Sequence, residues 1–415
     1  MMDTTSTLQQ DTADVAQAWP RNRDGDLLIG GMPLSQAVSR VGGTPCYLYD
    51  RAAIEARVAQ LRSLLSDRIE LHYAVKANPM PALVCHLARL VDGFDVASAI
   101  ELGVALDAGM SPKQISFAGP GKKEAELMQG LASGVLFNVE SARELRALAS
   151  MSEATGHPAR VALRVNLPFE AKSSSMKMSG GPRQFGIDSE LIPAMLSEIK
   201  SSHLQFEGFH LFAGSQNLRA QTLVDAQSRS YELVMSWLDQ MPQAPRILNL
   251  GGGFGIPYAP GDKVLDLASV TDHLNALSER LERDIPGARI AIELGRFIVG
   301  EAGLYVSSVI ERKLSRGHTF LIVDGGMHQH LAASGNFGQC IRKNYPVAMG
   351  HRGREKEMAS VVGPLCTPLD LLADRVEMDR AEEGDLFVVF QSGAYGRSAS
   401  PRDFLSHPDV REALI

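Results

Sequence analysis

The chain has 415 residues, 45% of them hydrophobic and 21% charged, and its formal net charge is −7 with a pI near 5.9. This length exceeds what one hydrophobic core usually supports, so we expect two domains. The chain is acidic and has no long basic run, which argues against a nucleic-acid partner. It has no apolar stretch long enough to span a membrane, so we do not expect a membrane partner.

The chain begins with a polar segment and contains β-rich stretches near both ends. We expect residues 1–25 to form a flexible tail. Residues 26–50 contain DLLIGGMPL and TPCYLYD, and the sequence after residue 300 contains GLYVSSVIERKLS, TFLIVDGG, ASVVGPL and DLFVVFQSG. We therefore predict a β domain formed by residues 26–50 and 301–415, with a second domain of residues 51–300 inserted between them.

Eight short β-like runs lie between residues 71 and 296, and each ends in a polar or glycine-rich stretch: LHYAVKA, DGFDVAS, QISFAG, VLFNVE, RVALRVN, FEGFHLF, RILNLGGG and RIAIELGR. Segments with helical spacing fill most of the intervals, which predicts a (β/α)8 barrel of about 250 residues. An open doubly wound sheet is the alternative. It requires a phosphate loop after the first strand, whereas the glycine-rich turn Gly251–Gly255 follows the seventh run. The long loop Pro168–Asp188 is a candidate lid.

Lys76 ends the first of these runs, in LHYAVKANP (Leu71–Pro79). A lysine at the C-terminal end of a buried strand has little water around its ammonium, and desolvation favours the neutral amine. A neutral amine can form a Schiff base with a carbonyl or with pyridoxal phosphate. The alternative for this segment is an interior lysine paired with a carboxylate for structural reasons.

Active sites of such barrels lie at the C-terminal ends of the strands. Residues at those ends here are Lys76, Asp95, Ser98, His210, Ser215, Gly251, Gly252, Gly253, Glu293 and Arg296. This set offers an amine for an aldehyde, backbone N–H groups and an arginine for a phosphate, and a carboxylate for a pyridinium nitrogen. Structural roles are the alternatives: Asp95 and Ser98 as helix caps, His210 as a core histidine, and the glycines as a simple corner.

From about Tyr47 to Ser400 the chain resembles the fold-type III pyridoxal-phosphate decarboxylases, the alanine-racemase-like group that includes diaminopimelate, ornithine and arginine decarboxylases. The matching motifs are HYAVKANP (His72–Pro79), FDVASAIEL (Phe94–Leu102), GFHLFAGSQ (Gly208–Gln216), GGGFG, ELGR (Glu293–Arg296), GPLCTPLD (Gly363–Asp370) and SGAYG (Ser392–Gly396). The resemblance implies a TIM barrel with a β domain, pyridoxal 5′-phosphate as cofactor, and a head-to-tail homodimer with shared active sites.

The resemblance also implies roles for single residues. Two residues would be catalytic: Lys76 of the same subunit and Cys366 of the partner subunit. Either one would protonate the substrate Cα. Cofactor-binding roles fall on Lys76, Asp95, His210, Ser215, Gly252, Gly253, Glu293, Gly295, Arg296 and Tyr395. A carboxylate such as Glu293 keeps the ring nitrogen protonated, which favours decarboxylation, whereas racemases of this fold have an arginine there. The four cysteines are far apart and suggest neither disulfides nor a metal site, so we expect a cytoplasmic decarboxylase without a metal.

Departures from the family pattern lie in the substrate region. Thr367 follows the cysteine where an acidic residue usually reads a distal ammonium, and Phe212 stands at the usual position of a ring-stacking histidine. The run MHQHLAASGNFGQ after Val323–Gly326 looks like the branch related to the butirosin-pathway decarboxylase, which acts on glutamate carried as an acyl-carrier-protein thioester. This favours an amino acid joined at its far end to a carrier or conjugate. The alternatives are a free diaminopimelate, ornithine or lysine substrate, or a catalytically inactive binding modulator.

Overall fold

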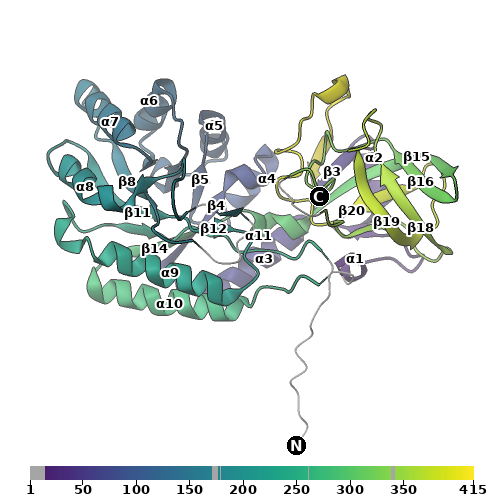
Figure 1. Cartoon of the computed structure of the whole chain (residues 1–415), viewed down its shortest axis with the longest axis horizontal. Coiled ribbons are helices and arrows are strands. Elements are labelled where there is room, and N and C mark those ends of the chain that lie inside the picture. Colours follow the sequence, from purple (N-terminus) through teal and green to yellow (C-terminus); the bar gives the residue numbers. More distant parts are fainter. Residues whose placement is uncertain (1–14, 171–175, 178, 260, 338–341) are drawn as a thin grey trace, which may run out of the picture. The chain divides into compact units, whose positions relative to one another are not determined.

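The computed structural model describes residues 15–170, 176–177, 179–259, 261–337 and 342–415 (Figure 1). Most of the predicted tail and part of the candidate lid lie outside the described residues. The chain divides into two compact units, a barrel unit of residues 57–255 and 265–297 and a β unit of residues 1–56, 256–264 and 298–415.

The barrel unit contains a closed barrel of parallel strands, which confirms the predicted fold. All eight predicted runs form strands, and these pair in the order β4 (Ile69–Ala74), β5 (Gly93–Val96), β6 (Ile115–Phe117), β7 (Leu136–Val139), β8 (Arg160–Asn166), β11 (Gln205–Leu211), β13 (Ile247–Asn249) and β14 (Arg289–Leu294). β14 pairs with β4 and closes the barrel. Almost every residue of these strands is buried, as expected for a parallel sheet covered on its outer face and filled inside.

Helices alternate with these strands along the chain (Figure 1). They are α3 (Arg51–Leu64), α4 (Pro81–Leu87), α5 (Ala99–Asp107), α6 (Glu124–Ser133), α7 (Ala142–Thr155), α8 (Ile192–Lys200), α9 (Ala220–Met235), α10 (Leu267–Asp284) and α11 (Arg296–Val299). The sequence sets several of their ends. The Ser98 side chain accepts from Glu101 N at the start of α5, Ser141 caps α7 in the same way, and left-handed Gly134 ends α6. The capping alternative therefore holds for Ser98.

The β unit combines both ends of the chain. β15 (Gly303–Ser315) pairs with β3 (Cys46–Tyr49), β16 (His318–Val323) and β20 (Leu386–Val389). The other strands and helices of the unit are α1 (Val15–Ala18), β1 (Leu28–Ile29), β2 (Met32–Pro33), α2 (Leu34–Arg40), β17 (Val347–Met349), β18 (Lys356–Val362), β19 (Leu371–Asp379) and β21 (Arg411–Leu414). Because β3 pairs with both β15 and β21, the N-terminal segment is a central part of the C-terminal sheet.

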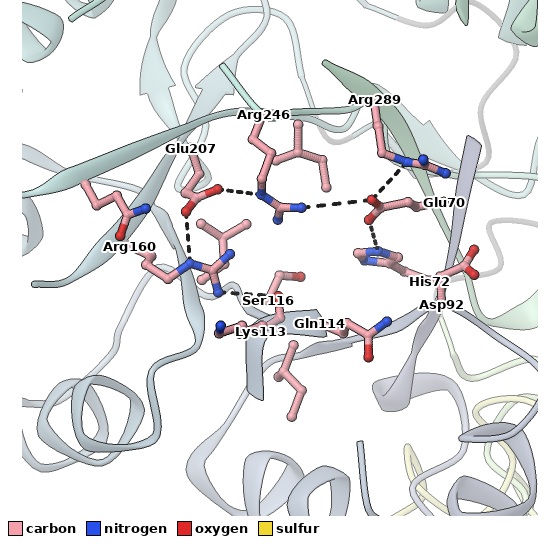
Figure 2. A pocket seen from close by; sticks show the side chains of 14 residues that line it. Glu70, His72, Asp92, Lys113, Gln114, Ser116, Arg160, Glu207, Arg246 and Arg289 are labelled. Carbon is pink, nitrogen blue, oxygen red and sulfur yellow. Dashed lines mark hydrogen bonds and ion pairs between the residues drawn. The ribbon is translucent and has the colours of Figure 1, made fainter. Parts of the chain in front are cut away.

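A cavity of about 580 Å³ lies at the N-terminal end of the barrel (Figure 2). Lys76 follows the C-terminal end of β4 and therefore belongs to the opposite end. Its charged lining forms ion pairs between strand starts. Glu207 accepts from Arg160 Nε at 2.9 Å and from Arg246 Nε at 2.6 Å. Glu70 lies 3.2 Å from Arg289 Nε and 3.2 Å from His72 Nε2. Charged residues at this end of a barrel typically stabilise the fold. We therefore interpret these ion pairs as structural, without a role in catalysis.

Replacing Glu207 with glutamine should lower the free energy of unfolding by about 2 kcal/mol at neutral pH, because two arginines lose their carboxylate. Burial raises the pKa of Glu207, but hydrogen bonds from Arg160 and Arg246 hold it below the usual 4.5. A carboxyl with a lowered pKa stabilises the fold above pH 4.5 and loses this effect as the pH falls through its folded pKa. Urea unfolding should therefore show a difference between the proteins that shrinks in acid. A difference that stays constant with pH would contradict the charge explanation.

Candidate active site

Most predicted site residues lie together at the C-terminal ends of the barrel strands. Lys76 belongs to a single turn, η2 (Val75–Ala77), directly after β4. Asp95 lies in β5, His210 in β11 and Glu293 in β14. Because parallel strands end at the same rim, residues that are more than two hundred positions apart in the sequence share one site.

The Lys76 amine lies beside a buried carboxylate. Nζ is 3.2 Å from Asp95 Oδ2, and the side chains of Lys76 and Asp95 are 39% and 0% exposed. Ser116 donates to the other oxygen of Asp95 at 3.0 Å. Burial and the neighbouring Glu293 carboxylate raise the pKa of Asp95, which the Lys76 ammonium only partly offsets. The lysine is thus paired with an acid, as its structural alternative requires, yet more than a third of its side chain remains accessible.

Glu293 is a buried carboxylate with a partner at each oxygen. Its Oε1 lies 3.0 Å from His210 Nε2, and its Oε2 accepts from Asn249 Nδ2 at 3.4 Å. Burial raises the pKa of Glu293, but the charges of His210 and Lys76 and the His210 hydrogen bond outweigh it, so the pKa lies well below its ordinary value. The site therefore presents a fixed negative charge, which suits a protonated ring nitrogen.

A glycine turn after β13 packs tightly against the neighbouring backbone. A Cβ on Gly252 would lie 1.9 Å from the carbonyl oxygen of Glu293, and one on Gly253 would lie 2.1 Å from that of Gly214. Gly251 and Gly253 also have positive φ values of 69° and 82°. Glycine therefore lets the turn lie directly against the carbonyls of Glu293 and Gly214. A turn of this kind, with glycines at positive φ, can present backbone N–H groups to a phosphate.

The remaining predicted residues of the barrel unit follow β11 and β14. Ser215 lies in β12 (Gly214–Ser215), which pairs with β9 (Met176–Lys177). Arg296 begins α11. A Cβ on Gly295 would lie 2.7 Å from Cβ of Ala77, the residue after Lys76, so glycine permits close packing beside the lysine turn.

Cys366 and Tyr395 are the predicted site residues that belong to the β unit. Cys366 is exposed in the loop between β18 and β19. The Asp370 carboxylate shapes this loop, since it accepts from Leu365 N at 2.9 Å and from Met327 N at 2.6 Å. Tyr395 has a φ of 57° in the segment after β20.

Ser116 and Asn249 contact buried carboxylates of the predicted set and are not predicted from the sequence. Ser116 donates to Asp95, and Asn249 donates to Glu293. Asn249 ends the seventh strand immediately before LGGG, so its position was an available signal. Ser116 lies inside a short apolar strand and gave no comparable sign.

The fold and this rim define a class of protein, the alanine-racemase-like barrel enzymes that use pyridoxal 5′-phosphate. Lys76, the ionised Glu293 and the glycine turn fit that cofactor's aldehyde, ring nitrogen and phosphate. Residues 51–300 match the family model described as "Pyridoxal-dependent decarboxylase, pyridoxal binding domain". The chain belongs to this family and is a pyridoxal 5′-phosphate-dependent decarboxylase.

Named relatives support the assignment over most of the chain. L-glutamyl-(BtrI acyl-carrier protein) decarboxylase of Niallia circulans is 39% identical, covering 89% of this chain and 88% of the relative. The 2-((L-alanin-3-ylcarbamoyl)methyl)-2-hydroxybutanedioate decarboxylase of Staphylococcus aureus is 31% identical, covering 87% of this chain and 92% of the relative.

A solved structure supports the same assignment. The structure of diaminopimelate decarboxylase from Helicobacter pylori complexed with L-lysine matches with a TM-score of 0.82 and 27% identity, covering 92% of this chain and 94% of that chain. The relatives named above are all decarboxylases, so the alternative of a catalytically inactive binding modulator is set aside. No helix in the described part of the chain is long and apolar enough to cross a membrane.

Proposed function

We propose that this decarboxylase acts on an amino acid whose far end is joined to a carrier protein or another bulky group. The observation that carries the proposal is the similarity to the Niallia circulans enzyme, whose name specifies a glutamyl group on an acyl-carrier protein. The Staphylococcus aureus relative, named for a conjugated substrate, points the same way.

The uncharged side chain of Thr367 supports this substrate class. Its hydroxyl accepts from Leu369 N at 3.3 Å, and its carbonyl accepts from Asp370 N at 3.2 Å, so the residue forms part of the turn beside Cys366. It brings no negative charge to attract the distal ammonium of a free diamino acid. A neutral linkage avoids leaving such an ammonium without a partner.

Each site residue has its own proposed role at the cofactor. When bound, pyridoxal 5′-phosphate supplies the electron sink for the bond to the leaving carboxylate. Lys76 is the amine that would hold the cofactor aldehyde, and Asp95 Oδ2, 3.2 Å from Nζ, can accept a proton from that amine. Glu293 would face the ring nitrogen with its negative charge.

The phosphate and the last proton transfer involve other residues. Gly252, Gly253, Ser215, Arg296 and Tyr395 would hold the phosphate through backbone N–H groups, hydroxyls and a guanidinium. We assign the Cα proton to the exposed thiol of Cys366 of the partner subunit. This assignment makes the enzyme a head-to-tail homodimer, and we place it in the cytoplasm.

Action on a free amino acid is the second candidate, because diaminopimelate decarboxylases are also similar to this chain. A substrate panel separates the two candidates. CO2 release should be faster from glutamyl thioesters of a carrier protein, or from citryl-type conjugates, than from free lysine, ornithine or diaminopimelate. We expect a difference of roughly a hundredfold in kcat/KM. Free glutamate is the control that shows whether the amino acid must be attached to a carrier.

The variant Thr367→Asp sharpens this test, because the added carboxylate should raise the relative rate with free diamino acids. Robust turnover of free lysine or ornithine by the unmodified enzyme would refute the substrate proposal and leave the decarboxylase chemistry intact.

A further inference from the structure

We propose that Asn249 is a positioning residue, whose single amide fixes the Glu293 carboxylate and the glycine turn relative to each other. Asn249 is the last residue of β13 and is 4% exposed. Its Oδ1 accepts from Gly251 N at 2.8 Å, and its Nδ2 donates to Glu293 Oε2 at 3.4 Å. The inference rests on the proposed roles of Glu293 at the ring nitrogen and of the turn at the phosphate.

The backbone already brings these two parts together. Glu293 N donates to the carbonyl of Gly251 at 2.9 Å, just beyond the last paired residues of β13 and β14. The space between them is full, since a Cβ on Gly252 would lie 1.9 Å from the Glu293 carbonyl. A shift of the turn would therefore move the strand end that carries the carboxylate, and Asn249 adds a side-chain link to this backbone link.

Only an amide suits both contacts. The N–H of Gly251 can only donate, so it must face Oδ1, and Nδ2 is then turned to the carboxylate. An aspartate of the same shape could accept from Gly251 but, when ionised, could not donate to Glu293. Alanine would lose both contacts. Because the amide is neutral, it orients Glu293 without neutralising it, and the charge that favours ionisation comes from His210 and Lys76.

The matched pair Asn249→Asp and Asn249→Ala tests the amide. Apoprotein is titrated with pyridoxal 5′-phosphate, and the visible absorbance of the bound cofactor is followed between pH 6 and 8. Both variants should bind the cofactor about tenfold more weakly at pH 8. In Asn249→Asp the affinity should recover toward pH 6, because a carboxyl beside Glu293 has a raised pKa and can donate once it is protonated. Asn249→Ala has no such group and should show no recovery.

Asn275→Asp is the control for losing a two-sided amide elsewhere. Asn275 in α10 accepts from Ser66 N at 2.8 Å and donates to the carbonyl of Leu64 at 2.9 Å, outside the site. This variant should unfold at a lower temperature while its cofactor affinity stays at the parent value. If the parent protein binds the cofactor and Asn249→Ala binds it equally well, the positioning role is overturned. If the parent protein itself fails to bind, the proposed function falls together with it.

Discussion

The variant Lys76→Ala is expected to release CO2 at least about a thousandfold more slowly than the parent enzyme, because it loses the amine that holds the cofactor aldehyde. It should also lose the covalent labelling that borohydride produces in the parent. Lys113→Ala is the matched control, since this exposed lysine lines the cavity at the opposite end of the barrel. Its activity should equal that of the parent. A Lys76→Ala protein with full turnover would remove the basis of the assigned chemistry.

Mixing the Lys76→Ala protein with a separate Cys366→Ala protein tests whether the two subunits share an active site. In a head-to-tail dimer, a mixed pair of the two inactive subunits restores one complete site from the unmodified Lys76 of one subunit and the unmodified Cys366 of the other. Equal mixing with subunit exchange should therefore recover roughly a quarter of the parent activity. If the two variants stay inactive after exchange, Cys366 acts within its own subunit or takes no part in the reaction.

Much of the barrel could be predicted because its pattern is local. Each parallel strand is a short apolar run, and most of the connecting segments have helical spacing, so the alternation is visible without any knowledge of contacts. The location of the site also follows from this alternation, because a barrel brings the C-terminal ends of all its parallel strands together at one rim. The alternation places Lys76, Asp95, His210 and Glu293 at one rim although they are far apart in the chain, and the structure confirms that placement.

Other features depend on contacts that no local pattern encodes. The ion pairs of Glu207 with Arg160 and Arg246 join three strands at the barrel base, and a charged residue at the start of a strand looks like any solvated one. Residues 256–264 directly follow the glycine turn yet belong to the β unit, which strand counting cannot reveal. The position of Asn249 at a strand end is visible in the sequence, but its two partners are not, because they are set by strand pairing and by a turn with positive φ.

Glu293→Gln should lower kcat by about 10²–10³-fold and change KM little, since an electrostatic contact at the reacting ring is lost while the shape is kept. The charge matters more than the hydrogen bonds because glutamine can still contact His210 and Asn249, but it cannot keep a ring nitrogen protonated. The visible absorbance of bound cofactor should change in this variant as well. Glu207→Gln is the control, as it removes a buried carboxylate from the same barrel without touching the rim.

The pH dependence of Glu293 separates its role from that of an ordinary catalytic acid. Its pKa lies well below 4.5, so the carboxylate stays ionised throughout the neutral range. The pH–rate profile of the parent enzyme should therefore show no limb from Glu293 above pH 5. In Glu293→Gln the rate should be lower at every pH, and a limb from Asp95 should shift to lower pH, because the neighbouring charge that helps to raise the Asp95 pKa is lost. A basic or acidic limb that disappears in the variant would mean that Glu293 exchanges a proton during turnover. In that case Glu293 would contribute to catalysis by proton transfer and not by a fixed negative charge.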